Sequence, residues 1–192
     1  MPRKVLLVGG IILVVVIAAI AFLSFTQKRA LSGSVLNPPW PSPEIALTDQ
    51  SGQPYSLHAQ RGKVVLIYFG YTNCPNECPL TMAHAKLARE SLGERAAHVQ
   101  VVMVSTDPVR DTPKALADFM ASFGPDFLGL TGTQAELEKA WKDYGVTVEQ
   151  GGEAHSTFLY VVDPAGDIRE TFQPDADPAV IAADLDLLLK GK

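Results

Sequence analysis

The sequence predicts an α/β fold in which helices cover a central sheet of mixed strand directions, preceded by one apolar helix. Three observations predict this architecture. Apolar, β-branched runs at 63–70, 99–106 and 156–163 are typical of strands buried on both faces. Segments with helical apolar spacing separate these runs, which favours a layered α/β domain. A charge-free run from Val5 to Gln27 stands in front of it.

The run at 5–27 predicts a transmembrane anchor. As a helix it would extend about 34 Å, at about 1.5 Å per residue, and a bilayer core is about 30 Å thick. The alternative is a cleaved secretory signal, but the apolar part of such signals is shorter, at roughly 7–15 residues. Basic residues flank both ends of the run, so orientation depends on the free amino terminus. We expect residues 1–4 in the cytoplasm and the folded domain on the periplasmic side of the cell membrane.

Residues 28–43 contain four prolines and predict a linker. Such a composition favours an extended polyproline II conformation and therefore a semi-rigid spacer. Trp40 is expected to lie on a surface. The folded domain then runs from 44 to 192.

Within 44–192 the expected elements alternate. Two short strands surround the turn at 50–52, and the first long strand is followed by a helix from Pro79 to about Leu92. Leu80, Ala83, Leu87 and Ala88 are expected on its buried face. The remaining elements are a strand at 99–106, a helix opened by Thr112 and Pro113, a strand at 127–130, a helix from Thr133 to about Tyr144, a strand at 156–163, its hairpin partner at 168–172 and a helix at 178–190.

Composition excludes one class of partner. The chain has a formal net charge of −5 at pH 7 and no basic cluster, which argues against nucleic-acid binding. Its two cysteines are too few for a disulfide-rich miniprotein.

Both cysteines lie in one short segment, and each precedes a proline. Because proline disfavours helical geometry in the residue before it, we expect Cys74 to Cys78 to form a loop, with Cys78 at the N-cap of the next helix. There the helix dipole would favour a thiolate, so both thiols are expected to be partly exposed and easily deprotonated. A structural disulfide closing so short a loop would stabilise little. A redox couple and a soft-metal site remain open.

A third ligand would distinguish these two readings. His155 is the candidate among four histidines, because it follows a glycine-rich stretch and precedes a buried strand at the mouth of the sheet. Two thiolates and one imidazole would select copper, whereas structural zinc calls for a fourth ligand. Asp107 is a further donor, although aspartate before proline is more typical of a turn or a helix cap.

Three motifs resemble the Sco/SenC family of membrane-anchored, thioredoxin-like copper proteins. They are "YFGYTNCPNECPLTM", "VSTDPVRDTP" and "HSTFLYVVDPAG", and the likeness covers essentially all of 44–192. The resemblance implies Cu(I) or Cu(II) ligation by Cys74, Cys78 and His155, with Asp107 in a supporting role. It also implies assembly of the dinuclear copper centre of cytochrome c oxidase subunit II, with another copper chaperone as a candidate donor.

One departure from the family pattern is visible between the cysteines. The family usually has aspartate and then an apolar residue after the first proline, and this chain has Asn76 and Glu77. The ligands are unaffected, but partner specificity could differ.

The leading functional hypothesis is copper delivery, with no catalytic residue. The alternative is a membrane-tethered thiol-disulfide reductase that uses Cys74 and Cys78 as a redox-active pair. In the thioredoxin fold a cis-proline packs against the redox pair, and by our alignment Ser156 takes that place here, which favours metal binding.

Overall fold

The computed structural model describes residues 13, 16–18, 30–149 and 158–191. The chain divides into two compact units, Met1–Ala30 and Leu31–Lys192, and the second is the folded domain. Among the described residues, no helix is both long and apolar enough to cross a bilayer. The predicted anchor at 5–27 lies almost entirely outside the described residues, so it and its orientation stay predictions.

The domain is built on one eight-stranded sheet of order β1-β8-β7-β4-β5-β6-β2-β3. The β4–β5 and β5–β6 pairs are parallel and the other pairs are antiparallel, which confirms the predicted mixed sheet. The strands are β1 (Ser34–Pro41), β2 (Ala46–Asp49), β3 (Pro54–Ser56), β4 (Val64–Gly70), β5 (Val99–Ser105), β6 (Phe127–Thr131), β7 (Leu159–Val162) and β8 (Asp167–Phe172).

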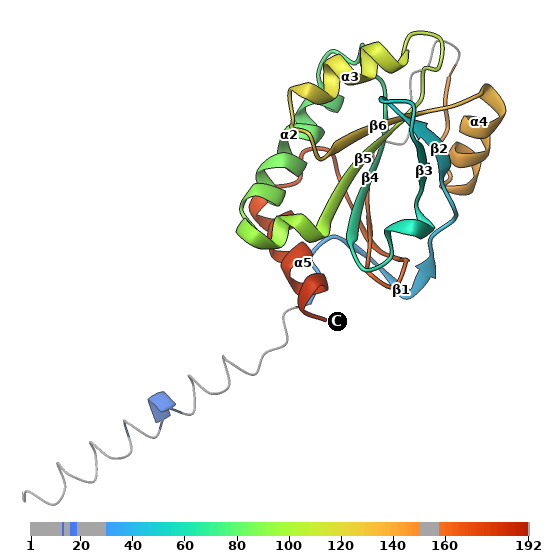
Figure 1. The fold of residues 1–192 in the computed structure, drawn as a ribbon. Helices are drawn as coiled ribbons and strands as arrows, with labels where there is room; N and C mark the ends of the chain where they lie inside the picture. The colour runs from blue at the N-terminus through green and yellow to red at the C-terminus, as the bar shows by residue number, and fades with distance from the viewer. Residues whose placement is uncertain (1–12, 14–15, 19–29, 150–157, 192) are drawn as a thin grey trace, which may run out of the picture. The chain divides into compact units, whose positions relative to one another are not determined.

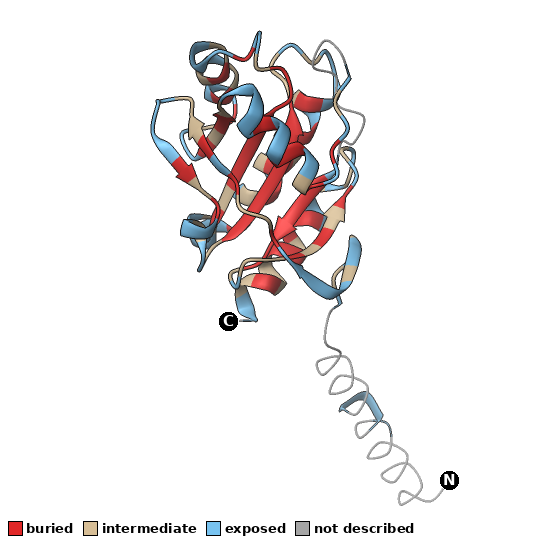
Figure 2. Cartoon of the chain, turned by 90° about the vertical axis from the view of Figure 1, so that its right-hand side faces the viewer, coloured by how far each residue is buried: buried red, intermediate tan, exposed pale blue. Residues whose placement is uncertain are grey.

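Helices cover both faces of this sheet (Figure 1). One hydrophobic core lies between the sheet and α2, α3 and α5, and the other lies beneath α4. The central strand β4 is buried along its whole length, as its apolar run predicts, and Figure 2 shows the buried band through the middle of the domain. The helices are α2 (Glu77–Glu90), α3 (Pro113–Ala121), α4 (Gln134–Asp143) and α5 (Pro178–Lys190), with short 3₁₀ turns at His58–Gln60 and Gly93–His98.

The structure confirms the predicted starts of the helices that follow β5 and β6. Thr112 caps α3, with Pro113 in its first turn. Thr133 and Glu136 form a reciprocal capping box at the start of α4. These local signals therefore position the segments that follow β5 and β6.

The expectation of a spacer at 28–43 is wrong for half of its length. Residues Ser34–Pro41 form strand β1, which pairs antiparallel with β8. The prolines are compatible with a strand because β1 is at the sheet edge, and the pairing is irregular between Val35 and Trp40. Trp40 is exposed, as expected.

The predicted buried face of α2 is wrong for its two leucines. Leu80 and Leu87 are 44% and 54% exposed. The buried residues are Cys78, Thr81, Met82, Ala85 and Ala88, of which Ala88 was predicted. The helix begins at Glu77, two residues earlier than predicted, so Cys78 belongs to it and sets the stripe that faces the sheet.

The last long strand is shorter than predicted. It was expected over 156–163, and β7 spans Leu159–Val162, while 156 and 157 lie outside the described residues. The turn that leads to β8 is confirmed: Asp163 Oδ1 accepts hydrogen bonds from the backbone N–H groups of Ala165, Gly166 and Asp167.

Candidate metal centre

The two cysteines lie where β4 ends and α2 begins. Cys74 is half-buried in the connecting loop, Cys78 is in the first turn of α2, and both are free. The backbone N–H of Cys78 donates a hydrogen bond to Cys74 Sγ at 3.3 Å. The thiol groups are therefore neighbours at the carboxyl end of a central strand, where ligand sites of α/β sheets gather.

The expected N-cap position of Cys78 is wrong. Asn76 is the N-cap of α2, and Cys78 is the second residue of the helix. Pro79 does not prevent this, because proline is tolerated in the first helical turn, where its missing N–H would have no partner inside the helix. Proline's effect on the preceding residue is a preference that the packing of Cys78 overrides.

The expectation of two accessible, easily deprotonated thiols fails for Cys78. This side chain is only 2% exposed. Burial first, and then the hydrogen bond with Cys74, raise the pKa of its thiol to about 12. Desolvation of the charged form therefore outweighs the favourable end of the helix dipole. Without a metal, Cys78 is a protonated thiol at neutral pH.

Two residues of β4 shape the space around the Cys78 sulfur. The hydroxyl of Tyr68 donates to Cys78 Sγ at 3.7 Å. A Cβ atom at Gly70 would lie 2.9 Å from the same sulfur and 2.6 Å from Cε1 of Tyr68. Gly70 therefore provides the room in which the sulfur lies, a role that the sequence pattern did not indicate.

A buried carboxylate that sequence reasoning missed holds the cysteine loop. Asp111 accepts hydrogen bonds from the backbone N–H and the hydroxyl of Thr72, at 3.0 and 2.7 Å. It also accepts a hydrogen bond from Ser105 Oγ at 2.6 Å. The signal available in the sequence was position: Asp111 follows β5, and the carboxyl ends of adjacent parallel strands meet at one edge of a sheet.

Asp107 is engaged in a turn. Its carboxylate forms an ion pair with Arg110, and its backbone carbonyl accepts from the N–H of Asp111 at 2.9 Å. Within the described ranges, no three His, Cys, Asp or Glu side chains form a group able to hold a metal ion. These contacts match the turn role that the sequence favoured, and the supporting metal role of Asp107 stays a prediction.

His155, the predicted third ligand, lies outside the described residues, as does Ser156. Their positions relative to the sulfurs therefore stay predictions. Of the other histidines, His58 is engaged elsewhere: its ring lies 2.9 Å from the carboxylate of Glu44.

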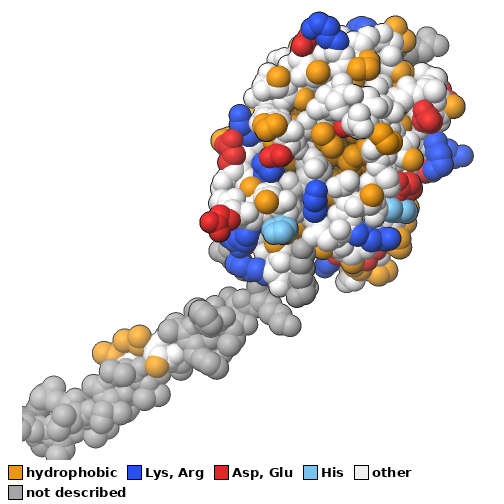
Figure 3. Space-filling model, in the orientation of Figure 1, with side chains coloured by type: hydrophobic (Ala, Val, Ile, Leu, Met, Phe, Trp, Pro, Cys, Tyr) orange, Lys and Arg blue, Asp and Glu red, His pale blue; other side chains and the backbone are white. Residues whose placement is uncertain are grey.

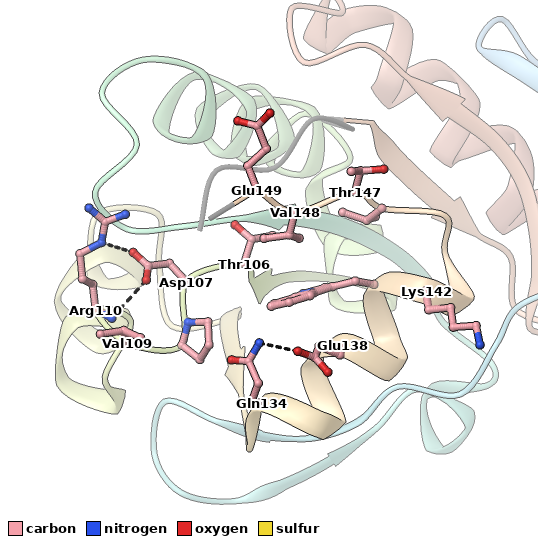
Figure 4. A pocket seen from close by; sticks show the side chains of 13 residues that line it. Thr106, Asp107, Val109, Arg110, Gln134, Glu138, Lys142, Thr147, Val148 and Glu149 are labelled. Atoms are coloured by element: carbon pink, nitrogen blue, oxygen red, sulfur yellow. Dashed lines mark hydrogen bonds and ion pairs between the residues drawn. The ribbon is translucent and has the colours of Figure 1, made fainter. Parts of the chain in front are cut away.

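A cavity of about 840 Å³ opens at the carboxyl end of β5 (Figure 4). Its described lining comes from residues 106–110, from α4 and from 146–149, and it includes Asp107 but neither cysteine. Two pairs of lining residues interact: Figure 4 shows Arg110 on Asp107, and Gln134 donating to Glu138. The cavity is thus separate from the thiol pair.

The charge distribution agrees with the composition. On the face shown in Figure 3, acidic and basic side chains are interspersed around hydrophobic ones and do not form a basic patch. This face is therefore unlike the electropositive surfaces that bind nucleic acid.

Comparison with known proteins identifies the family. The SCO1/SenC family model matches residues 42–190, which is most of the chain. The chain belongs to the SCO1/SenC family. It is 33% identical to protein SenC of Rhodobacter capsulatus over 150 residues, a match that covers 69% of this chain and 68% of SenC.

Solved structures of this family share the fold. ScoI of Bradyrhizobium japonicum with copper bound is 32% identical, with a TM-score of 0.69 over 77% of this chain and 98% of ScoI. BsSco, a member of the Sco family of cytochrome c oxidase assembly proteins in which a disulfide switch was identified, is 26% identical, with a TM-score of 0.68 over 83% of this chain and 99% of BsSco. The fold is therefore the thioredoxin-like α/β fold of Sco proteins, as the three sequence motifs predicted.

Proposed function

We propose that this chain is a copper metallochaperone that binds Cu(I) or Cu(II) through Cys74, Cys78 and His155. The observation that carries the proposal is the pair of free, adjoining cysteines at the β4–α2 junction. This pair occurs in a chain that is 32% identical to a ScoI protein whose structure contains copper.

The chemistry of the pair fits copper. Thiolates are soft ligands that select Cu(I), and imidazole also suits copper. Because the pKa of the Cys78 thiol is raised to about 12, this group would lose its proton only when the metal replaces it, and metal binding would release protons. The Asp107 carboxylate already pairs with Arg110, which favours a supporting role over direct ligation.

The half-buried position of Cys74 would give an acceptor access to the metal by ligand exchange. We propose the dinuclear copper centre of cytochrome c oxidase subunit II as the acceptor and another copper chaperone as the donor. Support comes from BsSco, which belongs to a family of cytochrome c oxidase assembly proteins.

The location is proposed from the N-terminal sequence. We propose that residues 5–27 form a single-pass anchor in the cell membrane, with residues 1–4 in the cytoplasm and the domain on the extracytoplasmic side. The test is alkaline extraction of membranes together with protease digestion of spheroplasts. Release of the intact chain at high pH would contradict an anchor, and protection of the domain from protease would contradict the orientation.

A second candidate function is supported by the same cysteine pair. The thiol of Cys74 could attack a disulfide of the acceptor, and Cys78 could then displace the acceptor's sulfur, leaving a Cys74–Cys78 disulfide and two reduced acceptor thiols. The 3.3 Å contact between the Cys78 N–H and Cys74 Sγ favours this reading, as does the disulfide switch of BsSco.

An anaerobic copper titration of the reduced full-length chain in detergent separates the two functions. We expect one equivalent of Cu(I), lost in Cys74→Ala, Cys78→Ala and His155→Ala. His58→Ala is the matched control and should bind normally, because His58 pairs with Glu44. Normal binding by His155→Ala, or zinc bound as tightly as copper, would favour the reductase.

A further inference from the structure

Asp111 connects the loop that carries Cys74 to the end of strand β5. Its side chain is only 1% exposed. One carboxylate oxygen accepts from the N–H and hydroxyl of Thr72, at 3.0 and 2.7 Å. The other oxygen accepts from Ser105 Oγ at 2.6 Å. The three donors thus come from two separate segments of the chain.

The carboxylate is itself held on rigid structure. Its backbone N–H donates to the carbonyl of Asp107 at 2.9 Å, and the next residue, Thr112, is the N-cap of α3. Ser105 Oγ also accepts from the N–H of Asp107 at 3.0 Å. Contacts that do not involve the cysteine loop therefore fix Asp111 between the end of β5 and the start of α3.

The contact reaches the loop two residues before Cys74. The N–H of Cys74 donates to the carbonyl of Tyr71 at 3.2 Å, which makes Tyr71 to Cys74 a tight turn with Thr72 inside it. The guanidinium of Arg110 lies 5.9 Å from the centroid of the Tyr71 ring, a second contact between the same two segments. Displacing Thr72 would therefore displace Cys74.

The residue type suits this role. A carboxylate accepts and does not donate, and here three donors converge on it. Hydrogen bonds to a charged acceptor are shorter and stronger than neutral ones. Alanine would leave the N–H of Thr72 and two hydroxyl groups without this partner.

We infer that Asp111 is a positioning residue that acts through Thr72 to set Cys74 Sγ beside Cys78. This inference rests on the proposed function of the cysteine pair. Residues that orient metal ligands typically change metal affinity by about 10–100-fold when they are mutated. Asp111 acts through one further residue, so we expect an effect of about tenfold.

The test uses two readouts on the full-length chain. One is anaerobic Cu(I) affinity, measured by competition with a chromophoric chelator. The other is the equilibrium of the Cys74–Cys78 disulfide with glutathione, which involves no copper. Forming the disulfide gives two electrons and two protons to oxidised glutathione, and a tenfold change in its equilibrium constant is about 30 mV.

Thr72→Val is the main variant, because it removes the hydroxyl donor and leaves the carboxylate in place. Thr106→Val is its control, because it makes the same side-chain change: Thr106 is fully buried, and its Oγ1 is among the buried side-chain atoms without a hydrogen-bond partner in the described residues. We expect Thr72→Val to weaken Cu(I) binding about threefold to tenfold and to shift the disulfide equilibrium. Thr106→Val should leave both values within about twofold of the wild type.

Asp111→Ala should lower Cu(I) affinity about tenfold, and Asp111→Asn, which keeps an acceptor for Thr72, should recover most of it. The inference is overturned if Thr72→Val and a folded Asp111→Ala keep both values within twofold of the wild type. It is also overturned if Thr106→Val changes them as much as Thr72→Val. If the wild type binds no copper while Thr72→Val still shifts the disulfide equilibrium, the proposed function fails and the positioning role stands.

Discussion

Gly70 shows how one residue can control the candidate metal centre. It is the last residue of β4, and an added Cβ atom would meet Cys78 Sγ at 2.9 Å. The conflict is steric and involves the sulfur directly. Interiors as closely packed as this one respond to even a single added methyl group.

We predict that Gly70→Ala lowers both stability and copper affinity. Overpacking of this kind costs about 1–3 kcal/mol, and the sulfur must move to make room. Urea unfolding and Cu(I) competition would measure the two effects. Gly129→Ala is the control, because its Cβ would meet Leu116 at 2.9 Å, in a part of the core away from the cysteines. Equal loss of copper affinity in both variants would contradict the prediction.

In helix α2 the buried face does not coincide with the largest apolar residues. Its larger apolar residues, Leu80 and Leu87, lie on the exposed side, and smaller residues together with Met82 face the sheet. The buried stripe runs along the helix from Cys78. The packing of this stripe therefore holds the first turn of α2, and with it one of the two candidate thiolate ligands.

The two faces of α2 should respond differently to truncation. Met82 is fully buried, so Met82→Ala should cost about 2–5 kcal/mol of unfolding free energy. Leu87→Ala should change it by less than about 0.5 kcal/mol, because the side chain is mostly in solvent. Urea unfolding monitored by circular dichroism compares the two variants. A larger loss for Leu87→Ala would contradict the assigned face.

At the scale of the whole domain, buried carboxyl groups fasten the segment that leads into β1. The backbone N–H of Ser32 donates to Asp184 Oδ2 at 2.6 Å, and that of Gly33 donates to Glu170 Oε2 at 2.9 Å. Glu170 is 0% exposed. Burial, together with the nearby Asp184, raises the pKa of the Glu170 carboxyl to about 7, whereas the nearby Arg169 lowers it.

This raised pKa predicts a pH dependence of stability. The folded state favours protonated Glu170. The stabilisation that this carboxyl group contributes to the folded state is therefore fully present below its unfolded pKa near 4.5. This stabilisation is lost as the pH rises through the folded pKa of about 7. Between about pH 5 and pH 8 the free energy of unfolding should fall by roughly 1–3 kcal/mol on this account.

Glu170→Gln should flatten the dependence, because an amide does not titrate in this range. Urea unfolding at several pH values would measure it. Glu94→Gln is the control, since Glu94 is exposed, and it should keep the slope of the wild type. An unchanged slope in Glu170→Gln would show that other groups cause the dependence.

Local signals in the sequence determined much of this architecture. The β-branched runs predicted β4 and β5, the Thr-Pro and Thr-x-x-Glu signals predicted the starts of α3 and α4, and the motif containing Cys74 and Cys78 predicted the family. Each of these depends on residues close together in the chain, where backbone preference and capping act.

Only the tertiary structure decided which groups are buried and which meet. Cys78 is a protonated, buried thiol because α2 packs against the sheet. Asp111 reaches Thr72 from 39 positions away because β4 and β5 lie side by side. The proline-rich segment becomes strand β1 because β8 offers it a free edge. Burial and long-range pairing depend on partners far along the chain, and no local pattern of residues contains them.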